Sequence, residues 1–159
     1  MVCRQFPRVA KALLTGLFFL VVGCGSNDTD PEAQLRQVIE QMQQAAEQRQ
    51  IGDLMAHVSE TYSDDAGQGW KQVRAAIQLQ FIRNPKIHTL KLVKFLEIEN
   101  AQHATATVLV AMAGRPISGA SALGSLRADL LRFDLLFEFE DHWKLTNARW
   151  SPANATDFL

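Results

Sequence analysis

Apolar residues recur three and four positions apart from residue 31 to about residue 84, which is the spacing of one helix face. The first run follows Asp30-Pro31, a capping residue and a residue preset for the first helical turn, and it predicts one long helix. A second, shorter helix is predicted where the pattern restarts at Ile51. A third begins at Trp70 and ends before Asn84-Pro85, because the residue before a proline disfavours the helical conformation.

From Ile87 onward the apolar spacing changes to alternation, which is typical of strands. The predicted strands cover 87–98, 104–112, 131–140 and 143–150. The first is irregular at Leu92-Val93, as a β-bulge explains, and a long Gly-, Ser- and Ala-rich connection covers 114–125. Helices followed by an antiparallel meander indicate an α+β domain. We predict three N-terminal helices packed in the concave face of a strongly curved, cone-like, about four-stranded antiparallel sheet.

The N-terminus has the pattern of a secretory signal. Three basic residues precede an apolar run over 12–22, and small Gly23 stands before Cys24. The run is about half of the roughly 20 residues that span a bilayer, so an uncleaved anchor is the weaker alternative. The stretch Val21-Val22-Gly23-Cys24 resembles a bacterial lipobox, which implies lipidation of Cys24. The predicted divisions are a lipoprotein signal peptide over 1–23, the lipidated cysteine and linker over 24–30, the folded domain over 31–151 and a tail over 152–159.

The lipobox resemblance also implies a place in the cell. A diacylglyceryl-cysteine with an added N-acyl chain, such as palmitate, anchors stably, whereas one chain does not. Gly25 rather than an aspartate follows the cysteine, which favours the outer membrane, with the domain facing the periplasm. The linker from Gly25 to Asp30 reaches at most about 20 Å, so the membrane is the first predicted partner and other partners lie near it.

Composition excludes several functions. Cleavage before Cys24 leaves 136 residues with 13 basic and 17 acidic side chains, a net charge of −4, so no nucleic-acid partner is expected. No thiol remains for a disulfide or a cysteine-ligated metal. The four histidines lack ligand spacing, and no phosphate loop or dinucleotide motif occurs, so we expect no metal and no cofactor.

The order of elements, the segment Tyr62-Ser63-Asp64-Asp65, and the closing Trp143-Lys144-Leu145 with Ala148-Arg149-Trp150 resemble the nuclear transport factor 2-like superfamily, also called SnoaL-like or cone-shaped α+β domains. The resemblance covers about 31–151. Within the superfamily, the chain is most similar to small proteobacterial lipoproteins.

Enzymes of that superfamily, such as ketosteroid isomerase and scytalone dehydratase, place acid and base groups inside the cone. The resemblance therefore implies Tyr62 as an acid and Asp64 or Asp65 as the group that moves a proton. The alternative is that both aspartates cap the turn, since Asp bonds its own neighbouring backbone. The side chains expected to line the pocket are Phe133, Phe137 and Trp143.

Three functions remain open. The first is a non-catalytic envelope lipoprotein that binds a partner protein or a small apolar ligand. The second is a small-molecule isomerase or dehydratase with an acid–base pocket. The third is an assembly factor that forms a homodimer through the outer sheet face, which carries Arg132 and Asp134 with Leu130 and Leu136.

One segment is basic. From Ala66 to Leu96 there is no acidic residue, and the segment contains Lys71, Arg74, Arg83, Lys86, Lys91 and Lys94. Near a membrane tether, such a segment fits anionic headgroups or an acidic partner. The alternative is that acidic neighbours in the fold balance these charges.

Overall fold

The computed structural model describes residues 30–159. The predicted signal peptide over 1–23 and the lipidation site Cys24 lie outside the described residues. Within residues 30–159, every helix is too short or too polar to cross a bilayer.

Three helices come first, as predicted: α1 Pro31–Glu47, α2 Ile51–Ala56 and α3 Trp70–Arg83. The Asp30 carboxylate accepts a hydrogen bond from the Glu32 backbone N–H at 3.2 Å and so caps α1. Arg49 stands between α1 and α2 with a positive φ of 58°, and its guanidinium donates to the Phe81 carbonyl at 2.6 Å. This contact fixes the end of α3 beside the α1–α2 turn.

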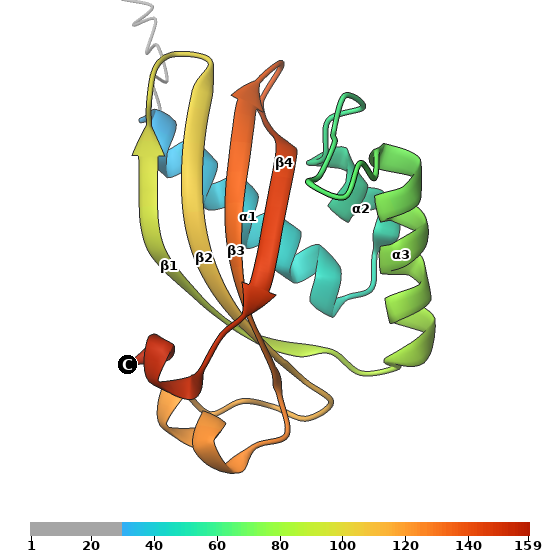
Figure 1. The fold of residues 1–159 in the computed structure, drawn as a ribbon, viewed down its shortest axis with the longest axis vertical. Coiled ribbons are helices and arrows are strands. Elements are labelled where there is room, and N and C mark those ends of the chain that lie inside the picture. The colour runs from blue at the N-terminus through green and yellow to red at the C-terminus, as the bar shows by residue number, and fades with distance from the viewer. Residues whose placement is uncertain (1–29) are drawn as a thin grey trace, which may run out of the picture.

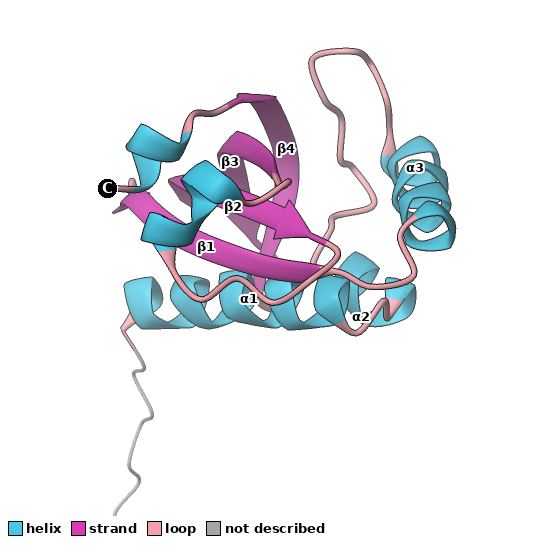
Figure 2. Cartoon of the chain, turned by 90° about the horizontal axis from the view of Figure 1, so that it is seen from below, coloured by secondary structure: helices cyan, strands magenta, loops and turns pink. Residues whose placement is uncertain are grey.

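The four strands form one antiparallel meander in the order β1-β2-β3-β4 (Figure 1). They are β1 His88–Ile98, β2 His103–Ala113, β3 Asp129–Phe139 and β4 Trp143–Pro152. Lys94 is an extra residue in β1, next to the predicted irregularity, and Thr146 is an extra residue in β4. Such bulges bend strands, and α1 crosses the face that the sheet curves around (Figures 1 and 2). The predicted α+β class with a curved four-stranded sheet is confirmed.

The main core lies between α1 and the concave face of the sheet. Leu35, Phe137 and Trp143 are all 2% exposed or less in this cluster. A second cluster covers part of the opposite, convex face of the sheet. It joins Leu109 and Ala111 of β2 to Leu123 and Phe158, which lie on the 3₁₀ helices η1 Ala120–Ser125 and η2 Ala155–Phe158. Both the connection over 114–125 and the expected tail over 152–159 therefore contribute a buried side chain to the fold.

Candidate functional site

The loop between α2 and α3 carries all three predicted acid–base residues. Its first part is held against the edge of β4. The Ser59 backbone N–H donates to the Leu145 carbonyl at 3.0 Å, and the Leu145 N–H donates to the His57 carbonyl at 2.8 Å. The backbone of this segment is therefore positioned by the sheet.

Tyr62 belongs to the main core and is 4% exposed. Burial first, and then the negative charge of Asp64, raise the pKa of Tyr62 to about 12, although a hydrogen bond with the Ala148 backbone opposes the rise. The phenol is therefore protonated at neutral pH, as the proposed acid requires, but it is enclosed by side chains of the core.

The structure uses Asp64 to build its own turn. The side chain is 6% exposed, and one carboxylate oxygen accepts from the Ala66 N–H at 2.9 Å and from the Gln68 N–H at 2.8 Å. Gly67 adopts a φ of 73° between these two donors. The other oxygen, Oδ2, is buried and has no hydrogen-bond partner among the described residues. The turn-capping alternative accounts for the geometry of Asp64.

Asp65 forms an ion pair with the sheet and takes no part in the Asp64 turn. It is half exposed, and its Oδ2 accepts from the Arg149 Nε at 2.5 Å. Arg149 is the register partner of Asp134 on the convex side of the sheet, where Asp134 pairs with Arg132 at 3.0 Å. The structure therefore brings Tyr62 near Asp64 but pairs Asp65 with a convex-face arginine.

Two of the three predicted pocket residues are packing residues. Phe137 and Trp143 are 1% and 2% exposed in the main core. Phe133 is half-buried on the same concave face, and its register partner on β4 is Trp150, which is 48% exposed. Cross-strand partners share a sheet face, so Phe133 and Trp150 form an apolar pair that solvent reaches. The sequence did not identify Trp150 as a binding residue. Alternation predicts which side chains share a sheet face, but it does not show whether another element covers that face.

A polar cluster ties the β3–β4 hairpin to the start of the loop. Glu140 accepts from the Ser59 hydroxyl at 2.6 Å and from the Lys144 ammonium at 2.9 Å. Lys144 also lies 3.1 Å from Asp141 and, with a backbone hydrogen bond, lowers the pKa of Asp141 to about 2. Sequence spacing could not bring Ser59 and Glu140 together, because they are distant in the chain.

The same end of the domain holds an edge-to-face histidine pair. The rings of His57 and His142 are 5.6 Å apart at 88°, and the His142 Nδ1 lies 3.0 Å from Asp141. Burial lowers the pKa of His57, the charge of His142 lowers it further, and Asp53 opposes the shift. The His57 Nδ1 is buried without a partner among residues 30–159. The sequence did not predict this pair, because the two histidines are far apart in the chain and not one helical turn apart.

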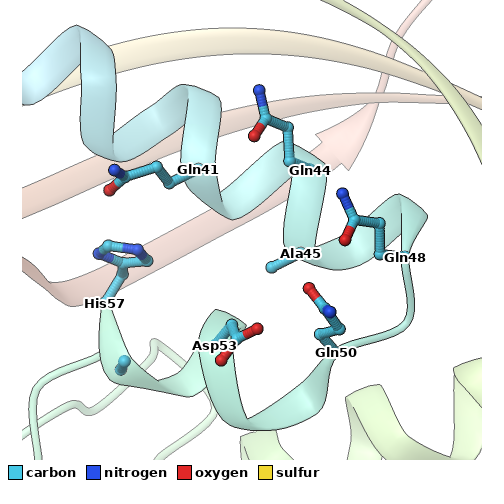
Figure 3. A pocket seen from close by; sticks show the side chains of 8 residues that line it. Gln41, Gln44, Ala45, Gln48, Gln50, Asp53 and His57 are labelled. Atoms are coloured by element: carbon cyan, nitrogen blue, oxygen red, sulfur yellow. The ribbon is translucent and has the colours of Figure 1, made fainter.

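A hollow of about 380 Å³ lies between α1 and α2, with His57 at one end (Figure 3). Apart from two alanines, its lining is polar: Gln41, Gln44, Gln48, Gln50, Asp53 and His57. It does not resemble the apolar pocket that the sequence led us to expect. Within the described residues, no group of three histidine, cysteine or acidic side chains is arranged to hold a metal ion.

No protein-family model and no curated protein matches the sequence, whereas many solved structures share the fold. A nuclear transport factor 2-like family protein from Streptomyces avermitilis is 16% identical, with a TM-score of 0.62 over 77% of this chain and 96% of that one. A ketosteroid isomerase-like protein from Erwinia carotovora atroseptica is 10% identical, with a TM-score of 0.59 over 79% and 98%.

The structure of Bd1075 from Bdellovibrio bacteriovorus is 13% identical, with a TM-score of 0.58 over 76% of this chain. The present chain spans only 40% of that protein. These structures define the class: the domain has the nuclear transport factor 2-like fold, as predicted. At such identities, the likeness shows the fold alone.

Proposed function

We propose that this chain is a lipid-anchored binding domain of the bacterial envelope. It takes a small apolar ligand, or an apolar segment of a partner protein, on the open part of its concave sheet face, and it does not catalyse a reaction. The observation that carries the proposal is the solvent-reached aromatic pair of Phe133 and Trp150. A tryptophan that is 48% exposed, opposite Phe133 in the strand register, offers a large apolar contact area to a ligand.

The positions of the acid–base candidates support a non-catalytic role. A proton-transfer pair needs both groups within hydrogen-bond reach of one substrate atom. Tyr62 is enclosed in the core, Asp64 accepts two backbone N–H groups of its own turn, and Asp65 pairs with Arg149. The positions of these three residues therefore favour a binding role at the aromatic pair over an acid–base mechanism.

The lipid anchor rests on the sequence around Cys24 and has its own test. Full-length chain expressed in a Gram-negative host is expected in the membrane fraction, with a mass that shows cleavage before Cys24 and added acyl chains. The variant Cys24→Ala is expected to keep its signal peptide and to incorporate no labelled palmitate. Palmitate incorporation into Cys24→Ala, or a wild-type chain without acyl groups, contradicts the anchor.

The apolar binding face is tested with 1-anilinonaphthalene-8-sulfonate, a dye that fluoresces on apolar surfaces. We expect a chain that begins at Gly25, in buffer without detergent, to enhance dye fluorescence, and we expect Trp150→Ala to remove most of the enhancement. Phe95→Ala is the matched control, because Phe95 is 51% exposed but belongs to the convex-face register with Thr107 and Asp134. Equal dye binding by both variants contradicts the proposed face.

A further inference from the structure

Helix α3 has apolar residues on two opposite sides. Its inner side contains Trp70, Val73, Ile77 and Phe81, which pack against the core clusters. At 100° per residue, Ala75, Leu79 and Ile82 fall on the other side of the helix. Leu79 is 44% exposed and Ile82 is 70% exposed. We call these three residues the outer stripe. Single exposed apolar side chains are normal on a protein surface, whereas neighbouring ones with a polar border mark interaction sites.

Cations border the outer stripe. The helical period places Lys71 on one side of it and Arg83 on the other, and Lys86 follows the end of α3. All three are exposed, and within residues 30–159 none of them is engaged in an ion pair.

The other three cations of the basic segment are used by the fold. Lys91 pairs with Glu40 at 2.6 Å, and Lys94 donates to the Asp157 carbonyl at 2.9 Å. Arg74 lies over the Trp70 ring at 5.5 Å. The basic segment therefore divides into three internally satisfied cations and three that surround the outer stripe.

The charge of this face restricts what can cover it. No acidic residue occurs between Ala66 and Leu96, so α3 itself supplies no negative charge to the cations beside the stripe. An occupant that matches the face is apolar at its centre and acidic at its edges. An anionic lipid surface and an acidic amphipathic protein helix both have that chemistry.

The arrangement of the helices favours the protein helix, an argument that rests on the proposed lipidation of Cys24. α1 has 17 residues and is about 25 Å long, and α3 stands beyond its C-terminal end (Figures 1 and 2). A linker of about 20 Å from Cys24 to Asp30 cannot place α3 flat on the membrane that holds the lipid. The outer stripe is therefore out of reach of that membrane.

We propose that the outer stripe of α3, with Lys71, Arg83 and Lys86, docks an acidic amphipathic helix of a partner protein in the envelope. The partner's apolar residues lie on Leu79 and Ile82, and its carboxylates meet the bordering cations. Helix-on-helix recognition of this kind reads apolar anchors three and four positions apart. One short helix face is smaller than a standard interface, so the complex is transient and salt-sensitive.

The first test uses a synthetic helical peptide with a leucine and alanine stripe bordered by glutamates, and full-length chain in mild detergent. Fluorescence anisotropy is expected to show binding that weakens about tenfold in Leu79→Gln/Ile82→Gln, because each change removes an apolar anchor. Lys71→Glu/Arg83→Glu is expected to lose this peptide and to gain a matched peptide bordered by lysines. Arg115→Glu/Arg127→Glu is the charge-matched control, since both residues are exposed outside α3.

Equal peptide binding by the α3 charge reversal and its control overturns the proposal, as does a charge reversal that gains nothing from the lysine peptide. These surface changes leave the core untouched, and circular dichroism checks that each variant is folded. The peptide assay does not depend on the anchor. A chain that proves to lack lipid therefore refutes the anchor without deciding the docking face.

The membrane alternative is decided with vesicles. A chain that begins at Gly25, and so has neither the lipid nor the basic signal peptide, is expected to bind vesicles of phosphatidylglycerol and phosphatidylethanolamine no better than vesicles of phosphatidylethanolamine alone. Binding that needs phosphatidylglycerol, and is lost in Lys71→Glu/Arg83→Glu, assigns the face to lipid and overturns the protein partner. In cells, a photocrosslinker at Gln78 is expected to label an acidic helical segment of another protein, and labelling of lipid contradicts the proposal.

Discussion

The role of Asp64 can be measured by removing it. Asp64→Ala deletes the oxygen that accepts the Ala66 and Gln68 N–H groups at 2.9 and 2.8 Å. Losing a side-chain acceptor at such a turn costs about 1 kcal/mol for each backbone donor, so we expect a loss of about 2 kcal/mol of unfolding free energy. For a domain of this size that loss corresponds to a fall in Tm of about 8 °C.

The assay is urea denaturation followed by circular dichroism and tryptophan fluorescence. Asp64→Asn keeps one acceptor oxygen at the same position, so it is expected to lose about half as much stability or less. Asp65→Ala is the neighbouring control, because an exposed ion pair such as Asp65 with Arg149 contributes under about 1 kcal/mol. Asp64→Ala as stable as the wild type, or Asp65→Ala less stable than Asp64→Ala, refutes the assignment of Asp64 to the turn.

The same variants report on Tyr62, the only tyrosine of the chain. The charge of Asp64 is one cause of the raised pKa of Tyr62, which lies at about 12. Asp64→Asn is therefore expected to lower the pKa of Tyr62, followed by phenolate absorbance at alkaline pH. An unchanged titration in a folded variant contradicts the electrostatic contact between the two residues.

Three further predictions concern the core, the end of α2 and the β3–β4 hairpin. Phe137→Ala is expected to cost about 4 kcal/mol in urea denaturation, whereas Phe139→Ala, at a position that is 40% exposed, costs about 1 kcal/mol or less; similar losses contradict the burial of Phe137. Burial lowers the pKa of His57 below 6.5, so the unfolded chain takes up a proton that the folded chain resists, and stability that is present above pH 6.5 is lost as the pH falls below it. Denaturation at several pH values is expected to show a smaller acid loss in His57→Gln, and an unchanged pH profile refutes this cause. Lys144→Met is expected to raise the pKa of Asp141 from about 2 toward 3.8 in an NMR titration, because the Lys144 hydrogen bond is the largest cause of the shift; a pKa that stays low assigns the shift to the backbone instead.

The candidate site was only partly predictable from the sequence. Tyr62, Asp64 and Asp65 were found because they form a polar cluster in a turn-rich segment, and the two opposing interpretations of Asp64 were both available. Deciding between them required the distances from its carboxylate to the Ala66 and Gln68 N–H groups. Trp150 was missed as a binding residue, because alternation along a strand does not show that this side chain stays 48% exposed in the fold.

The sequence by itself determined the order and type of the elements. Apolar spacing, capping residues and proline marked the helix after Asp30-Pro31, the end of α3 before Pro85 and the irregular first strand, because all three are local properties of the chain. It also determined that the residues from Ala66 to Leu96 carry only positive charge.

The tertiary structure decided which of these positively charged side chains remain free to contact a partner. Folding places Glu40 beside Lys91 and the Asp157 carbonyl beside Lys94, but it leaves Lys71, Arg83 and Lys86 around an exposed apolar stripe. The helical period could place Leu79 and Ile82 on one side of α3, but not show that this side is outermost. Contacts between residues distant in the chain decide which face is covered, and local spacing contains no information about them.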